Sequence, residues 1–210
     1  INTERITVDD YCALLTEAGI DARAAGTNGL TLVQPVPVSQ LPHFHDGFVS
    51  VQDASAQLAG LLLSPEPGMT VLDACAAPGG KACHLAELGA TVTAADISED
   101  RLVKVDENAN RLNLSITSVL SDGRSLHEVL AHASFDAILL DVPCSATGVM
   151  RRNPDVKVIR RKSDIDQFAA LQSELLRSVW ALLKPGGRLL YATCSVLSQE
   201  NDAIVGRFLN

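Results

Sequence analysis

From residue 53 onward, short apolar runs alternate with longer segments in which apolar residues recur at helical spacing. Runs that are apolar on both faces are typical of strands covered by helices on both sides. The expected strands span residues 70–72, 91–95, 116–120, 137–140 and 188–192. Because strands and helices alternate, the pattern predicts βαβ units, an α/β fold and a mainly parallel sheet.

The helical segments between these strands end at clear stop signals. Gly89 follows one of them, Pro-Glu-Pro-Gly at 65–68 follows another, and Lys-Pro-Gly-Gly at 184–187 follows a third. The expected helices span residues 54–63, 80–88, 99–112, 126–131 and 164–183, with a last helix beginning near residue 199. Glycine and proline thus divide this part of the chain into regular strand–helix units.

Residues 1–52 have a less regular pattern. Acidic residues follow Thr7, an apolar helical face comes next, and a glycine ends it, which predicts a helix. Short strands are expected at 30–33 and 48–51, with a proline-rich stretch between them. We therefore expect a small α+β lead-in over residues 1–52 and one larger domain over residues 53–210.

Composition indicates a folded, globular chain. The 210 residues are 47% hydrophobic and 20% charged, and the mean hydropathy is +0.16, which excludes a disordered chain. Aromatic residues make up only 4%, which argues against a protein that stacks single-stranded nucleic acid on rows of rings. The formal net charge of −8 argues against a passive nucleic-acid coat, which needs a basic surface.

The five cysteines and the first residues of the chain indicate a reducing compartment. There is no CxxC pair and no Cys/His zinc spacing, so we expect reduced thiols and a cytoplasmic protein without a structural metal. The N-terminal residues show no signal-peptide pattern, and no apolar run approaches the roughly 20 residues of a membrane span. His43 and His45 lie beside Asp46, but such a loop is more typical of a surface segment than of a metal site.

Acidic residues and cysteines follow the predicted strands. Ligands of parallel α/β sheets bind at the carboxyl ends of the strands, so these positions are the candidates for function. Four strands lead into an aspartate and the fifth leads through Thr193 into a cysteine: Asp73, Asp96, Asp122, Asp141 and Cys194.

The loop after the first strand reads Asp73-Ala-Cys-Ala-Ala-Pro-Gly-Gly-Lys81. Its two glycines allow a ligand to approach the backbone in front of a helix N-terminus. It is not a phosphate-binding P-loop, because Cys75 and Ala82 stand where that motif needs Gly and Ser or Thr, and it is not GxGxxG. A plain tight turn is the alternative interpretation.

The next two strand ends suggest a nucleoside. Asp96 is placed to accept the hydroxyls of a ribose; a cap of the following helix is the alternative interpretation. Asp122 is placed to meet an adenine edge, although Ser-Asp-Gly is also an ordinary turn. A ribose and an adenine without a phosphate cradle suggest S-adenosyl-L-methionine, which leaves as S-adenosyl-L-homocysteine; a nicotinamide cofactor is the alternative.

Two cysteines sharpen this hypothesis. Cys144 and Cys194 follow the fourth and fifth strands and would face one pocket if those strands are neighbours. A thiolate that adds to carbon 6 of cytosine makes carbon 5 nucleophilic toward a methyl donor, and a nearby acid such as Asp141 would stabilise the adduct. Cys12 and Cys83, on apolar helix faces, fit a small buried hydrophobe better. The chemistry alone leaves open which cysteine attacks.

Three motifs, at 73–81, 141–145 (Asp-Val-Pro-Cys-Ser) and 191–195 (Tyr-Ala-Thr-Cys-Ser), together resemble the signatures of the RNA 5-methylcytosine methyltransferases. Within that family the chain is most similar to the bacterial 16S ribosomal RNA group called Sun, Fmu or RsmB. The narrower match lies in residues 46–57, 144–157 and 171–174. The resemblance implies a Rossmann-like S-adenosylmethionine-dependent methyltransferase fold.

The resemblance also implies roles for individual residues. Cys194 would be the nucleophile, Cys144 would assist product release, and Asp141 would lie beside the donor and the base. The cofactor would be bound by Cys75, Ala76, Ala77, Pro78, Gly79, Gly80, Lys81, Asp96, Asp122 and Asp141. The family fold has a final strand pair and the group has an upstream helical RNA-binding domain, so we expect this chain to be an incomplete catalytic domain with its lead-in.

Basic residues gather in residues 151–162, hereafter the basic segment, which carries a local charge of +5 while the rest of the chain carries −13. Its members are Arg151, Arg152, Lys157, Arg160, Arg161 and Lys162. The segment follows Cys144, so we expect it to hold RNA phosphates while a cytosine enters the pocket, although a solvated loop is the plainer interpretation.

The predicted partner is 16S ribosomal RNA, naked or at an early stage of assembly, bound by a monomer. The alternatives are a cytosine-C5 methyltransferase that acts on tRNA, other RNA or DNA, and a non-catalytic ribosome-assembly factor that retains the fold.

Overall fold

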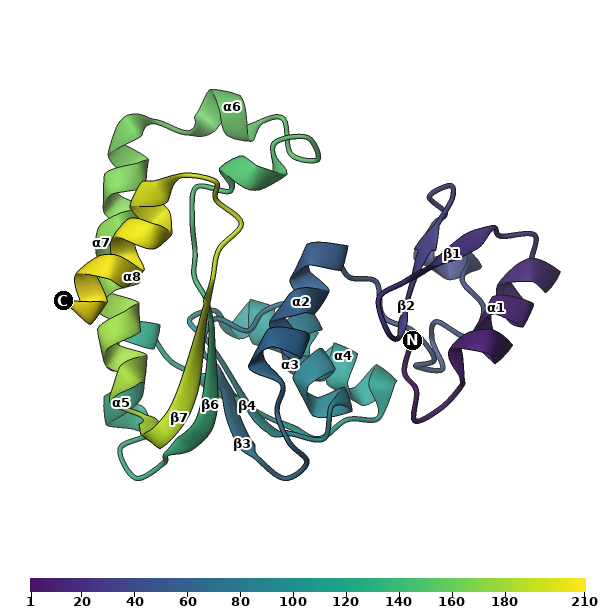
Figure 1. Ribbon diagram of the computed structural model, residues 1–210, viewed down its shortest axis with the longest axis horizontal. Coiled ribbons are helices and arrows are strands. Elements are labelled where there is room, and N and C mark those ends of the chain that lie inside the picture. The colour runs from purple at the N-terminus through teal and green to yellow at the C-terminus, as the bar shows by residue number, and fades with distance from the viewer.

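The structure, a computed structural model, describes residues 1–210 (Figure 1). Its centre is a five-stranded sheet with the order β5-β4-β3-β6-β7, and every neighbouring pair is parallel. The strands are β3 (Thr70–Asp73), β4 (Thr91–Asp96), β5 (Ile116–Leu120), β6 (Phe135–Asp141) and β7 (Leu183–Ala192). The predicted parallel sheet is therefore confirmed, and the order reverses at β3, where β4 and β6 lie on opposite sides.

Helices cover both faces of the sheet. In Figure 1, α2, α3 and α4 lie on one side and α5, α7 and α8 on the other. Each side has its own core: Ala59, Leu85 and Val105 pack on one face, and Leu126 and Leu176 pack on the other. The helices are α2 (Ala54–Leu63), α3 (Gly80–Glu87), α4 (Glu99–Leu112), α5 (Leu126–Val129), α7 (Lys162–Trp180) and α8 (Asp202–Leu209). The double covering explains why the strands are apolar on both faces.

The predicted end of the longest helix is wrong. The helix α7 ends at Trp180, and the Lys-Pro-Gly-Gly stretch predicted to follow it lies inside β7. Phe135 pairs with Leu183, and a register shift follows before Ala137 pairs with Arg188. The irregularity in the ladder accommodates the proline and glycines, which a regular central strand would not.

Two other helix ends differ from prediction for local reasons. The helix α5 stops at Val129, two residues early, and the last helix α8 begins at Asp202. A short 3-10 turn, η4 (Ser198–Glu200), occupies the position predicted to start that last helix. Single-turn segments of this kind are common at helix ends.

The lead-in contains α1 (Val8–Glu17) and an antiparallel hairpin of β1 (Ala22–Ala25) and β2 (Gly29–Leu32). Thr7 caps α1 by accepting a hydrogen bond from the backbone of Asp10. Its core is formed by Tyr11, Leu15, Leu41 and Val49. The predicted helix and the first predicted strand are thus present, while β1 was not predicted because Ala-Arg-Ala-Ala lacks β-branched residues.

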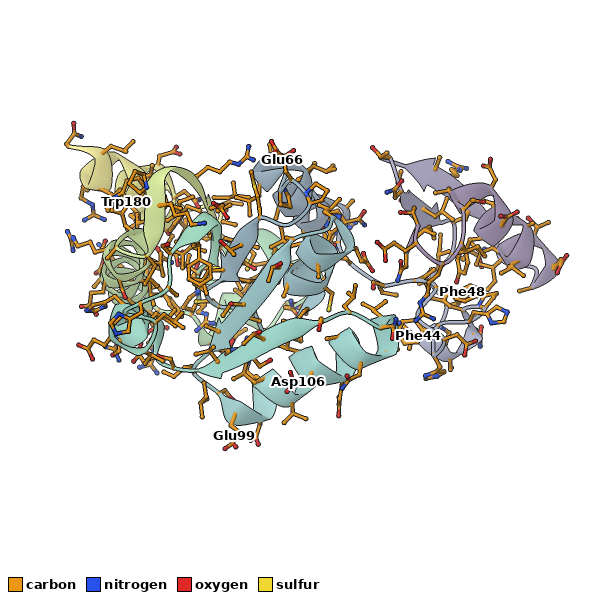
Figure 2. The ribbon with its side chains drawn as sticks, turned by 90° about the horizontal axis from the view of Figure 1, so that it is seen from below. Phe44, Phe48, Glu66, Glu99, Asp106 and Trp180 are labelled. Carbon is orange, nitrogen blue, oxygen red and sulfur yellow. The ribbon has the colours of Figure 1, made fainter.

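The strand predicted at 48–51 is absent. The carbonyl of Phe48 accepts the backbone N–H of Asn2, and the carbonyl of Val49 accepts Nη1 of Arg111 at 2.9 Å. Arg111 also donates to the carbonyl of Phe44 at 2.8 Å and lies over its ring. A side chain of α4 therefore takes the place of a neighbouring strand and joins the lead-in to the larger domain. Figure 2 shows Phe44 close to the end of α4.

None of the helices combines the length and the apolar character needed to cross a lipid bilayer.

Candidate active site

A cavity of about 1040 Å³ opens at the carboxyl ends of the strands. Residues that follow all five strands line it, and α2 forms a further wall. Among the predicted site residues, the lining includes Cys75, Ala77, Lys81, Asp96, Asp122, Asp141, Cys144, Arg152 and Cys194. Cys75 and Cys194, 119 positions apart in the sequence, therefore share one pocket at the place where parallel sheets bind ligands.

The loop between β3 and α3 forms the floor of this cavity. Gly79 has a φ of +99°, and a Cβ added there would lie 3.0 Å from Cα of Val105, so this position requires glycine. A Cβ on Gly80 would meet nothing closer than 3.8 Å, which leaves the first turn of α3 open to a ligand. Burial raises the pKa of Cys75 to about 12, so this thiol stays protonated. Ala76, Pro78, Gly79 and Gly80 shape the loop without lining the cavity.

Asp96 joins the ends of β3 and β4. Its buried carboxylate accepts the backbone N–H of Ala77 at 3.2 Å and that of Ser98 at 3.1 Å. Arg101, which sequence analysis missed, lies 3.5 Å from the same carboxylate and donates to the carbonyl of Ala77 at 2.7 Å. Ser98, not Asp96, occupies the N-cap position of α4. The carboxylate is thus held rigidly at the cavity wall.

Asp122 has the geometry of a turn residue. It caps the 3-10 turn η2 (Gly123–Ser125) by accepting the N–H of Arg124 at 2.9 Å, and it pairs with the Arg124 guanidinium at 2.6 Å. These bonds to Arg124 hold the pKa of Asp122 below its ordinary value. Both residues line the cavity, so a ligand would meet an ion pair at this point rather than a free carboxylate.

Asp141, at the end of β6, pairs with Nζ of Lys81 at 2.7 Å. Behind this pair, Asp73 is 1% exposed and neither of its carboxyl oxygens has a hydrogen-bond partner. Burial, followed by the charge of Asp141, raises the pKa of Asp73 to about 7. The ion pair faces the cavity, whereas Asp73 lies beneath it.

Cys144 and Cys194, hereafter the cysteine pair, meet with their sulfur atoms 3.2 Å apart. The two loops that carry them also touch through the backbone, because the N–H of Gly148 donates to the carbonyl of Cys194 at 2.8 Å. A Cβ on Gly148 would lie 2.6 Å from that carbonyl oxygen, so only glycine allows this approach. The expectation that both thiols share one pocket is met by this geometry.

The contact changes the acidity of the two thiols in opposite directions. The thiol of Cys194, as hydrogen-bond donor, lowers the pKa of Cys144, and the same bond together with burial raises the pKa of Cys194. The pair as a unit therefore gives up one proton more easily than two separate thiols and holds the second more tightly.

The basic segment divides into anchored and free side chains. Arg152 pairs with Asp53, the N-cap of α2, across the cavity. Arg160 donates to the carbonyl of Ser145 at 3.1 Å and lies over the ring of Phe168. Arg161 is bonded through its backbone alone, whose N–H donates to the carboxylate of Asp164 at 2.9 Å at the start of α7. Four side chains are exposed and form no ion pair: Arg151, Lys157, Arg161 and Lys162.

The histidine and the two cysteines that were not expected to take part in catalysis lie outside the cavity. His43 pairs with Asp46 at 2.7 Å on the surface of the lead-in. Cys83 is buried between α3 and α4, as predicted, while Cys12 is half-buried on α1.

Solved structures place the fold in a class. A methyltransferase homolog protein from Pyrococcus horikoshii superposes with a TM-score of 0.86 and 33% identity, covering the whole chain and 68% of its own. NSun6 from Pyrococcus horikoshii, solved with SFG, gives a TM-score of 0.76 and 30% identity over 88% of this chain and 49% of its own. The chain has the Rossmann-like fold of the S-adenosylmethionine-dependent methyltransferases, and S-adenosyl-L-methionine is the cofactor of this class.

Sequence comparison narrows the class to a family. The family model for 16S rRNA methyltransferase RsmB/F matches residues 60–210, and the chain belongs to that family. It is 48% identical over 217 residues to ribosomal RNA small subunit methyltransferase B of Pasteurella multocida (strain Pm70). It is also 48% identical over 206 residues, 96% of this chain, to the protein of the same name from Proteus mirabilis (strain HI4320). The chain spans about half the length of these relatives, 49% in each case.

Proposed function

We propose that this chain carries the catalytic site for S-adenosylmethionine-dependent methylation of carbon 5 of a cytosine in 16S ribosomal RNA. The observation that supports this most directly is the cysteine pair at the wall of the cavity, with its sulfur atoms 3.2 Å apart. Methylation of a nitrogen or an oxygen needs no thiol, whereas carbon 5 of cytosine must first be activated by a nucleophile at carbon 6. Membership of the RsmB/F family supports ribosomal RNA as the substrate.

The cavity fits the cofactor. Its lining includes Cys75, Ala77 and Lys81 of the loop after β3, and the Asp96 carboxylate faces a space large enough for a nucleoside. The loop residues 75–81, Asp96 and Asp122 would hold the cofactor, and Asp141 would lie next to it. S-adenosyl-L-methionine supplies a methyl group on a positively charged sulfur, which suits a cavity with acidic residues at several strand ends.

The cysteine pair and Asp141 would perform the covalent steps. Cys194 would give its proton to the Cys144 thiolate as its sulfur forms a bond to carbon 6 of the cytosine, and the ring electrons would make carbon 5 nucleophilic toward the methyl group. Asp141 and its Lys81 partner, which both line the cavity, would stabilise the charge on the ring. Loss of the carbon-5 proton to a base then restores the C5–C6 double bond and expels Cys194 as a thiolate, with Cys144 assisting release.

The assignment of Cys194 as nucleophile follows the family resemblance and has one structural support. Cys194 is exposed at the cavity, whereas Cys144 is half-buried. An incoming base would therefore meet Cys194 first. The lowered pKa belongs to Cys144 and that of Cys194 is raised, so the Cys144 thiolate would act as the base that takes the proton of Cys194.

The free side chains of the basic segment would hold RNA phosphates, and the anchored ones would fix the segment over the cavity. We further propose a monomeric, cytoplasmic enzyme that acts on naked or early-assembly small-subunit RNA, with its catalytic domain beginning near residue 53.

The test uses the full-length protein with labelled cofactor and protein-free 16S RNA, and compares Cys194→Ala, Cys144→Ala and the control Cys12→Ala. Wild type and control should form 5-methylcytosine, Cys194→Ala should form no covalent RNA adduct, and Cys144→Ala should accumulate one on denaturing gels. An adduct that persists in Cys194→Ala would overturn the role assignment. Label that enters only tRNA or DNA, or no nucleic acid at all, would overturn the proposed substrate or activity.

A further inference from the structure

A fully buried carboxylate lies beneath the cysteine pair. Glu200, the last residue of η4, is 0% exposed. Its carboxylate accepts the backbone N–H of Ser145 at 2.8 Å and the hydroxyl of the same residue at 2.5 Å. It also accepts the hydroxyl of Ser195 at 2.6 Å. Ser145 directly follows Cys144 and Ser195 directly follows Cys194, so one carboxylate binds both cysteine loops.

A second layer of hydrogen bonds holds Glu200 itself. Gln172 of α7, also 0% exposed, donates to the Glu200 carboxylate at 3.3 Å and to the carbonyl of Pro143 at 3.0 Å. The hydroxyl of Tyr191, on β7, lies 2.9 Å from the Glu200 carbonyl and 3.1 Å from the Gln172 side-chain oxygen. The network therefore connects the helix, the last strand and both loops into one rigid unit.

Burial of a carboxylate is costly, and a hydrophobic residue of similar size would fill this space at lower cost. The stability of the fold alone therefore does not explain an acid here. A single acceptor for two hydroxyls and a backbone N–H does explain it, because only an anionic fork can bind both cysteine loops at once.

We propose that Glu200 is a positioning residue that, through Ser145 and Ser195, holds the thiols of Cys144 and Cys194 at hydrogen-bonding distance. The role rests on the proposed function, since a fixed pair of thiols matters for covalent attack and release. Glu200 does not line the cavity and would touch neither the base nor the cofactor.

The positions of the two loops also control the chemistry of the thiols. An S–H···S bond exists only while the two sulfur atoms touch, so a looser pair behaves as two separate cysteines. The other groups that act on the pair are Asp141 from β6, Tyr191 and Thr193. These residues are unchanged in the variants below, so an altered thiol profile reports on the loop positions.

The test compares Glu200→Gln, Glu200→Asp and the double variant Ser145→Ala/Ser195→Ala in the full-length protein. Glu107→Gln, an exposed glutamate on α4, is the matched control. Two quantities are measured: the pH dependence of iodoacetamide labelling at Cys144 and Cys194 by mass spectrometry, and kcat and KM for methyl transfer to protein-free 16S RNA.

We expect Glu200→Gln to shift the onset of labelling to higher pH and to lower kcat about tenfold with KM unchanged, because small misplacements of reacting groups slow the chemical step. Glu200→Asp should recover part of both losses. In the double serine background, a further Glu200→Gln change should add little, because the three groups act as one unit.

Two results would overturn the positioning role. One is a Glu200→Gln variant with the labelling profile and kcat of wild type; the other is full additivity with the serine changes. If Glu200→Gln fails to fold, the double serine variant alone tests the positioning role, because it must show the same shift of cysteine labelling to higher pH. A wild-type protein without methyl transfer would contradict the proposed function, while the labelling comparison would still test Glu200.

Discussion

At the scale of single residues, the candidate site consists of paired polar groups. Lys81 and Asp141 pair at 2.7 Å, and Asp96 is bonded to two backbone N–H groups and faces Arg101. Groups that are already paired need little rearrangement when a ligand binds. The exception is Asp73, which is buried below the cavity without a hydrogen-bond partner.

We expect Asp96→Asn to weaken binding of S-adenosyl-L-methionine about tenfold or more, because an amide keeps only one acceptor oxygen and loses the charge-assisted bonds. Isothermal titration calorimetry measures the change. Asp100→Asn, an exposed acid in the first turn of α4, serves as the control and should bind as wild type does. Equal affinity of the Asp96 and Asp100 variants would contradict a role for Asp96 in cofactor binding.

The sequence predicted those site residues that stand directly after a strand, since parallel strands must bring their carboxyl ends together. Asp96, Asp141, Cys144 and Cys194 belong to this group. It could not predict Glu200, which reaches the site through contacts across two loops. Arg101 left only a weak signal, a basic residue five positions after Asp96 and within the first turn of a helix.

At the scale of elements, the basic segment contains a short helix that is held at both ends. Val156 of the helix α6 (Val156–Ile159) is buried. Arg160, which follows the helix, donates a hydrogen bond to Ser145 in the loop that carries Cys144. Lys157 points to solvent from the same turn. One basic residue therefore has a structural role, and its neighbour is free to bind phosphate.

We expect Lys157→Ala to lower the slope of log Kd against log salt for 16S RNA by about 1, as the loss of one phosphate contact does. Arg160→Ala should leave that slope nearly unchanged and instead lower kcat, because it frees the Cys144 loop. Filter binding across a salt series gives the slopes, and Lys104→Ala on α4 is the control. Equal slopes for Lys157→Ala and wild type would remove Lys157 from the RNA contacts.

Hydrophobic periodicity predicted strands correctly where the residues are buried within the central sheet. The apolar run at 137–140 lies inside β6, and 91–95 lies inside β4. The prediction from periodicity was wrong at 48–51, where an arginine from α4 donates a hydrogen bond to the backbone in place of a neighbouring strand. It was also wrong at 184–187, where an irregularity in the β6–β7 pairing accommodates a proline and glycines that usually end a helix or strand. Both failures come from contacts with distant segments, which periodicity does not describe.

At the scale of the whole molecule, charge is separated. The chain carries −8, yet its basic segment carries +5 and lies over a cavity whose walls hold several aspartates. The low aromatic content fits a site that takes in one base at a time. The basic segment would attract a polyanion such as RNA to the opening of the cavity, and the aspartates inside the cavity would suit a cationic methyl donor.

The buried, unpartnered Asp73 links this acidic floor to global stability. Its pKa is raised from 3.8 to about 7 in the folded chain, so folding keeps a proton that the unfolded chain releases. The stabilisation is complete below pH 4 and is lost as the pH rises through 7.

Asp73→Asn removes this dependence. Relative to wild type, the variant should therefore gain on the order of 2–4 kcal/mol in free energy of unfolding between pH 4 and pH 8. Urea unfolding at several pH values measures the difference, and Asp166→Asn, an exposed acid on α7, corrects for the loss of one carboxyl group. Glu87, whose pKa burial also raises to about 7, is present in both proteins and cancels. Parallel pH profiles for Asp73→Asn and wild type would show that Asp73 is ionised in the folded protein, and the floor of the cavity would then carry one more negative charge beneath the methyl donor.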